Sequence, residues 1–233
     1  MKNIILLTVA IFIIIGCSKA PFDIIPVSSD YIIPKFANKD FVDIDKIMEI
    51  SKFRSSTGHD YSDSFESNRS MKHYYYPYDK YKGDDNTIKI YSPVDGFINR
   101  TSLESANQAN DEQVHINPYG HPYMTIILFH INCLINPGEK VTAGQHIGYA
   151  SLSPKNGIVI GGFDIAIKIS TKKGSKLISY FDIMTDELFA IYQIKGIPNR
   201  ETLIISKEWR DNNSANFSGR DENNFVRFTE ISY

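Results

Sequence analysis

Short stretches of alternating hydrophobic and polar residues, separated by turns, dominate the chain from about residue 87 onward. Alternation with a period of two is typical of β-strands that bury one face. The pattern predicts strands at residues 87–91, 97–100, 113–117, 123–134, 140–150, 158–160 and 163–170. The turns between them include Pro-Val-Asp-Gly, Asn-Pro-Tyr-Gly and Asn-Pro-Gly-Glu, which favour tight reversals. We therefore expect a mainly β, antiparallel domain of the sandwich or barrel-like type.

The pattern changes to a helical period between residues 179 and 194. Hydrophobic residues recur there at the spacing of one helix face, namely Phe181, Met184, Leu188, Ile191 and Tyr192. Gly196 and Pro198 follow as stop signals. Residues 225–231 have the composition of a closing strand. We expect a β domain over residues 41–172 and a helical and irregular C-terminal appendage over residues 173–233.

The N-terminus has the pattern of a secretory signal. Lys2 precedes an apolar run at residues 4–15, which is too short to span a bilayer comfortably and ends at Gly16-Cys17. The tetrapeptide Ile14-Ile15-Gly16-Cys17 resembles the bacterial lipobox. The resemblance implies a signal peptide at residues 1–16 and diacylglyceryl (palmitate-type) lipidation of Cys17. The stretch that follows contains Pro and Ser without clean periodicity, which predicts a tether at residues 17–40. We expect an extracytoplasmic lipoprotein, anchored to the cell membrane or to an outer membrane.

Composition is that of an ordinary globular domain, with 42% hydrophobic and 22% charged residues. The formal net charge of -2 gives no indication of a nucleic-acid partner. Cys133 is the one cysteine left if Cys17 carries lipid, so we expect no intramolecular disulfide.

The candidate chemical residues occur in a definite order. His59 and Asp63 are separated by three residues, and the turn at residues 93–96 leads into the next predicted strand. His130 then lies in an apolar-aromatic element of the next strand, Leu-Phe-His-Ile. A glycine-rich hammerhead follows, with Gly138, Val141, Gly144, Ile147 and Gly148. The alternating strand that carries Asp164 comes last.

In this order the segments resemble the lysostaphin/LytM-type zinc metallopeptidases, which cleave peptide cross-links of bacterial peptidoglycan. The resemblance covers about residues 55–170, with an insertion-like stretch at residues 64–88. It implies the duplicated hybrid-motif β fold of that family. It also implies that His59 and Asp63 bind zinc and that His130 and Asp164 occupy catalytic positions.

One position departs from the family pattern. The last strand of family members carries His-x-His, and the alternation here places Asp164 and Ala166 at those two positions. Ala166 cannot bind a metal, and a catalytic zinc normally has three protein ligands and an open position. The resemblance therefore implies that zinc is possible but that its site is incomplete.

Three interpretations remain open. In the first, the chain is a pseudoenzyme that binds peptidoglycan or a cell-wall hydrolase through the family's groove. In the second, it is an active zinc endopeptidase in which Asp164, His115 or His121 becomes the third ligand. The third interpretation is a module that shares the hammerhead without the peptidoglycan link. Biotinyl and lipoyl carriers are examples, although the hairpin here offers no suitably flanked lysine. We favour a cell-wall-associated, metallopeptidase-like lipoprotein that is not an enzyme.

Overall fold

The computed structural model describes residues 25–104, 110–154 and 161–229. Cys17, the signal segment and the strand expected at 158–160 lie outside these ranges. Within them, none of the helices combines the length and the apolar character needed to cross a membrane.

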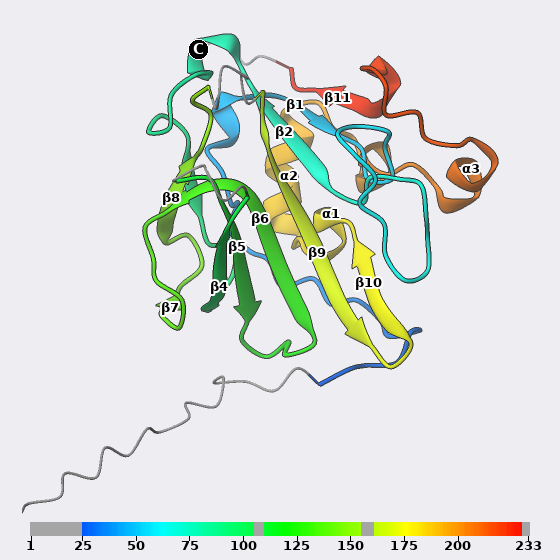
Figure 1. The fold of residues 1–233 in the computed structure, drawn as a ribbon, viewed down its shortest axis with the longest axis horizontal. Coiled ribbons are helices and arrows are strands. Elements are labelled where there is room, and N and C mark those ends of the chain that lie inside the picture. Colours follow the sequence, from blue (N-terminus) through cyan, green and yellow to red (C-terminus); the bar gives the residue numbers. More distant parts are fainter. Residues whose placement is uncertain (1–24, 105–109, 155–160, 230–233) are drawn as a thin grey trace, which may run out of the picture.

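The described strands form one antiparallel sheet whose strands differ in length (Figure 1). Its main path runs in the order β11-β1-β2-β9-β6-β5-β4-β7, while β10 pairs with β9 and β8 pairs with both β3 and β6. The strands are β1 (Ile47–Ser51), β2 (His73–Pro77), β3 (Lys89–Tyr91), β4 (Gly96–Leu103), β5 (Glu112–Pro118), β6 (Met124–Cys133), β7 (Lys140–Val141), β8 (His146–Ala150), β9 (Phe163–Thr171), β10 (Gly174–Ile178) and β11 (Phe225–Arg227). The expected mainly β, antiparallel fold is confirmed.

Short helices follow the strands in the C-terminal part of the chain: α1 (Tyr180–Ile183), α2 (Asp186–Ile194) and α3 (Lys207–Asn212). One-turn 3₁₀ helices occur at Ile44–Lys46, Asp79–Tyr81, Arg200–Leu203 and Glu222–Asn224. The single helix expected over residues 179–194 is wrong, because Met184 is extended and Thr185 caps a second helix by accepting a hydrogen bond from the Leu188 amide. The exposed side chain of Ile191 is likewise not on the buried face.

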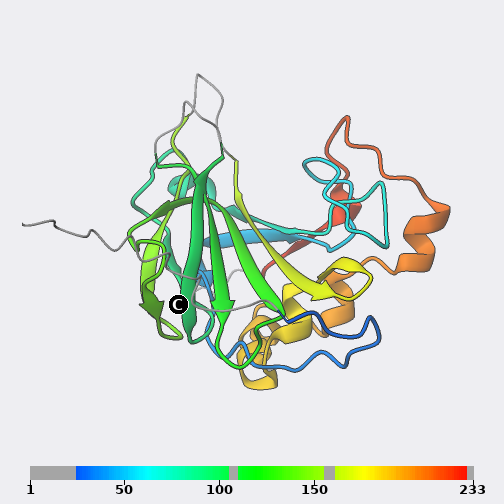
Figure 2. The same ribbon diagram turned by 60° about the horizontal axis from the view of Figure 1, so that its bottom comes forward.

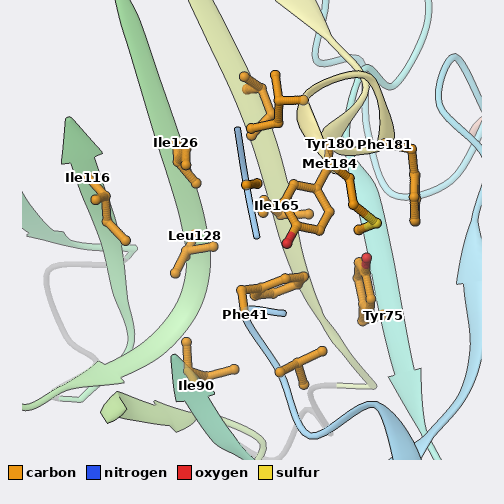
Figure 3. Packing of buried hydrophobic residues seen from close by; sticks show 14 of the residues in the cluster. Phe41, Tyr75, Ile90, Ile116, Ile126, Leu128, Ile165, Tyr180, Phe181 and Met184 are labelled. Atoms are coloured by element: carbon orange, nitrogen blue, oxygen red, sulfur yellow. The ribbon is translucent and has the colours of Figure 1, made fainter. Parts of the chain in front are cut away.

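The main core lies between one face of the sheet and the helices. Figure 3 shows Ile116, Ile126, Leu128 and Ile165, from β5, β6 and β9, pointing toward Phe41 and Tyr180. Helices α1 and α2 lie behind these strands in Figure 1 and below them in Figure 2. Residues 25–40, expected as a tether, run along this domain, with bridges at Val27 and Ala37.

The opposite face of the central strands carries a second, smaller core. Ile127, Phe129 and Ala166 lie there with Phe53, Met71 and Leu177. Ile127 is the cross-strand partner of Ala166, and Phe129 is the partner of Asp164. Because directly opposed residues share a face of the sheet, Asp164 and Ala166 project to this outer side, as their alternation predicts.

The expected strand over residues 140–150 is divided into β7 and β8. Gly144 interrupts it with a φ of +81°, a left-handed conformation that glycine adopts without a side-chain penalty. The turn places β7 beside β4 and β8 beside β6. Along β6, the residues before His130 therefore pair with β9, and the residues after it pair with β8.

Candidate functional site

A bulge in β6 fixes the direction of the His130 side chain. On β5, Glu112 is opposite Ile131 and Val114 is opposite Leu128, so one residue of β5 faces both Phe129 and His130. His130 has a φ of +59°, which is uncommon for a residue other than glycine. Such backbone costs on the order of 1–3 kcal/mol and persists where surrounding contacts over-determine it. Bulges also redirect side chains beside functional sites, so His130 is a candidate functional residue.

Two buried carboxylates flank the His130 imidazole. Its Nδ1 lies 3.0 Å from Oδ1 of Asp111, and its Nε2 lies 3.9 Å from Oδ1 of Asp164. Burial lowers the pKa of His130. The hydrogen bond to Asp111 and the charges of Asp164, Asp111 and Glu104 raise it, and together they outweigh burial, so the net shift of the pKa is upward. The contact with Asp111 makes Nδ1 the donor and leaves Nε2 of this partly exposed side chain as the nitrogen that a ligand can meet.

Lys72 supplies a second cation to Asp164. Its Nζ lies 2.7 Å from Oδ2 of Asp164, and the two side chains are 5% and 0% exposed. The same ammonium lies 3.5 Å from the ring centroid of Phe129 and 4.3 Å from that of Tyr61. Burial, together with the charges of Asp164 and Glu104, raises the pKa of Tyr61 to about 12, so this ring is a neutral cation–π partner. We call Lys72, Asp111, His130 and Asp164 the buried charge cluster.

The structure brings two of the four expected site residues together. His130 and Asp164 meet in the buried charge cluster, whereas no hydrogen bond or ion pair among the described residues joins either of them to His59 or Asp63. The His59 side chain is exposed, and its Nδ1 lies 2.9 Å from the carbonyl oxygen of the next residue, Asp60.

Both carboxylate oxygens of Asp63 are used in holding the chain. Oδ1 accepts hydrogen bonds from the Phe65 and Glu66 amides, at 2.7 and 2.9 Å. Oδ2 accepts one from the Leu177 amide, at 2.7 Å, which ties this loop to β10. Asp63 is therefore a structural connection between the loop and the sheet.

These residues do not fit a catalytic zinc site. Asp164 is held by an ammonium group, Asp63 is satisfied by three backbone amides, and Ala166 lies in an apolar cluster. Among the described residues, no three or more His, Cys, Asp or Glu side chains are grouped so that they could hold a metal ion. The Lys72 ammonium neutralises the Asp164 carboxylate and therefore weakens its attraction for a second cation.

The two alternative histidine ligands are engaged elsewhere. The His115 Nε2 lies 3.1 Å from a guanidinium nitrogen of Arg100. His121 stacks on Phe36, with ring centroids 4.0 Å apart, and its Nδ1 lies 3.1 Å from the Tyr123 hydroxyl. No contact of the described residues brings either histidine to the buried charge cluster.

Sequence reasoning did not identify Lys72 or Asp111. Lys72 lies within the stretch interpreted as an insertion, and Asp111 precedes β5 without any motif around it. Their partners are 92 residues (164 minus 72) and 19 residues away along the chain. The one available signal is Lys72 itself, a charged residue that directly precedes the aromatic run of β2.

Comparison with known proteins gives distant structural similarities. Lysostaphin is 15% identical, with a TM-score of 0.34 over 54% of this chain and 52% of that chain. A chain of the SpoIIQ–SpoIIIAH pore-forming complex is 13% identical, with a TM-score of 0.42 over 68% of this chain and 97% of that chain. Csd3 of Helicobacter pylori is 14% identical, with a TM-score of 0.37 over 85% of this chain and 48% of that chain. The chain thus spans about half the length of the lysostaphin and Csd3 chains. No family model and no curated protein sequence matches this chain.

Proposed function

We propose that this protein is a lipid-anchored, extracytoplasmic domain that binds peptidoglycan or a cell-wall hydrolase and does not use a catalytic metal. The observation that carries the metal-free part is the contact of 2.7 Å between Lys72 and Asp164, at the position where a family enzyme carries a histidine. The ordered sequence motifs support the cell-wall part. The domain assignment, with a signal at 1–16, a tether at 17–40 and an appendage at 173–233, belongs to the same proposal.

Contacts with Lys72 and His130 stabilise the two buried carboxylates of the site without a metal ion. Asp111 and Asp164 are 0% exposed, and buried carboxylates are costly unless they are paired. Lys72 pairs with Asp164, and the His130 Nδ1 donates to Asp111, a contact that raises the pKa of His130. The His130 Nε2 then remains available for a hydrogen bond with a polar group of a bound ligand.

An active zinc peptidase is the weaker alternative. It needs a third ligand, and His115 and His121 are held by Arg100 and Phe36. It also needs the carboxylate of Asp63, whose two oxygens already accept backbone hydrogen bonds.

Binding to the cell wall can be tested by sedimentation with purified peptidoglycan. We expect the purified full-length chain to sediment with the insoluble polymer in excess chelator, and to release no soluble fragments when zinc is added. A chain that stays in the supernatant contradicts binding to peptidoglycan and leaves a cell-wall hydrolase as the proposed partner. Fragments released only after zinc addition contradict the metal-free proposal.

The lipid anchor can be tested at Cys17, which lies outside the described residues. We expect Cys17→Ala to leave the membrane fraction or to accumulate as an unprocessed precursor, because the acyl chains supply about 0.8 kcal/mol per buried methylene. Cys133→Ala is the matched control, since this half-buried thiol donates only to the Ile135 carbonyl. Fractionation with immunoblotting distinguishes the two, and a processed, membrane-bound Cys17→Ala would show that the anchor is elsewhere.

A further inference from the structure

A group of basic side chains lies on the outer face of the sheet, separate from the buried charge cluster. Arg100 of β4 is the cross-strand partner of His115 of β5. Val114 and Ile116, on either side of His115, belong to the main core, so His115 faces outward. Lys168 of β9 lies opposite Thr125 of β6, and His115 lies opposite Ile127, so both side chains project from the same face of the sheet. The charge of Lys168 also lowers the pKa of His115. We call Arg100, His115 and Lys168 the basic cluster.

The basic cluster holds two cations around a neutral imidazole. The guanidinium of Arg100 can only donate, so the His115 Nε2 at 3.1 Å is the acceptor. Burial, with the charges of Arg100 and Lys168, lowers the pKa of His115 to about 4. Burial and the charge of Arg100 also lower the pKa of Lys168. Each shift shows that the environment disfavours positive charge.

No counter-ion accompanies these cations in the described part of the chain. Arg100 and Lys168 take part in none of the salt bridges found among the described residues. By contrast, Asp164, on the same outer face of β9 as Lys168, has its own lysine. An anion from outside the described chain would relieve the repulsion within the basic cluster.

A second feature on the same face accepts hydrogen bonds. Asn117 lies two residues beyond His115 on β5 and is 4% exposed. Its Nδ2 donates to the Met124 carbonyl, at 3.1 Å, but its Oδ1 is buried without a hydrogen-bond partner among the described residues. Two residues along a strand span about 7 Å. A ligand that fits both features carries an anionic group and, within about that distance, an N–H donor.

We propose that the basic cluster binds the terminal carboxylate of a peptide, with Asn117 accepting from a peptide N–H. The Arg100 guanidinium matches a carboxylate in its planar, forked geometry, and Lys168 adds a second charge. The choice of a peptide rests on the proposed cell-wall function, because the cross-links of peptidoglycan are peptides. The choice of a carboxylate rests on the basic cluster alone.

The test follows the His115 imidazole by NMR during pH titration, with His115→Gln to assign its signals among the 6 histidines. The probes are D-alanyl-D-alanine, its C-terminal amide and inorganic phosphate. We expect the free dipeptide to raise the pKa of His115 from about 4, because a bound anion favours the imidazolium. Affinity should accordingly fall as the pH rises through the pKa of the complex. The amide should leave His115 unchanged.

Variants separate this site from general attraction to a positive surface. Arg100→Gln and Lys168→Gln should each weaken dipeptide binding on the order of 10-fold or more, as expected for a charge-assisted hydrogen bond. Lys140→Gln, an exposed lysine of β7, is the matched control and should have no effect. Equal binding of the amide, an equal loss in Lys140→Gln, or a response to phosphate alone overturns the proposal.

The outcome is independent of the sedimentation test. A dipeptide that binds in the NMR test while the chain fails to sediment with peptidoglycan refutes the proposed binding to peptidoglycan and leaves the carboxylate site standing. Sedimentation without any response of His115 refutes the carboxylate site alone.

Discussion

Lys72→Met is expected to lower the free energy of unfolding by about 3–5 kcal/mol, the range found when one partner of a buried ion pair is removed. Lys72 is 4% exposed, and its partner Asp164 is 0% exposed. Methionine retains most of the volume between the rings of Phe129 and Tyr61. The loss should therefore come from the buried, unpaired carboxylate more than from a cavity. Chemical denaturation monitored by circular dichroism measures the change.

Two further variants test that explanation. Lys82→Met removes a lysine from an exposed ion pair with Asp79 and should change stability by less than about 1 kcal/mol. Lys72→Met combined with Asp164→Asn should recover much of the loss, because the charge left behind is removed. A Lys72→Met protein as stable as the wild type would show that Asp164 is not paired with Lys72 in solution. In that case the Asp164 carboxylate would keep its charge available for a metal ion.

The sheet could be predicted from the sequence because its signal is local. Alternation in residues 113–117 and 163–170 corresponds closely to β5 and β9. β1 and β2 were not predicted, since the Tyr-rich run of β2 lacks alternation and is buried on both sides. The break between α1 and α2 at Met184 was not predicted, because it depends on one capping residue, Thr185, and a hydrophobic pattern carries no signal for a cap.

The candidate site could be predicted only in part. His130 and Asp164 follow from motif order and are brought together in the fold. The pairing of His130 with Asp111, and of Asp164 with Lys72, arises from neighbouring strands and loops whose separation along the chain carries no periodic signal. His59 and Asp63 have the spacing of a metal-binding pair. The spacing does not show that the Asp63 carboxylate accepts hydrogen bonds from backbone amides of its own loop and of β10. The role of His59 and Asp63 as zinc ligands, which the family resemblance implies, stays untested, and the proposed metal-free function predicts the opposite.

Zinc binding by the wild-type chain tests the central proposal, that this protein uses no catalytic metal and that Lys72 neutralises Asp164 instead. A functional site has three protein ligands and binds zinc stoichiometrically, with proton release. The measurement is an equilibrium zinc titration of the wild type beside His59→Ala and Asp63→Ala, with bound metal quantified after gel filtration. We predict no stoichiometric zinc in any of the three proteins and no difference among them. One tightly held zinc per wild-type chain, lost in His59→Ala and Asp63→Ala, would contradict the account and identify a working metal centre.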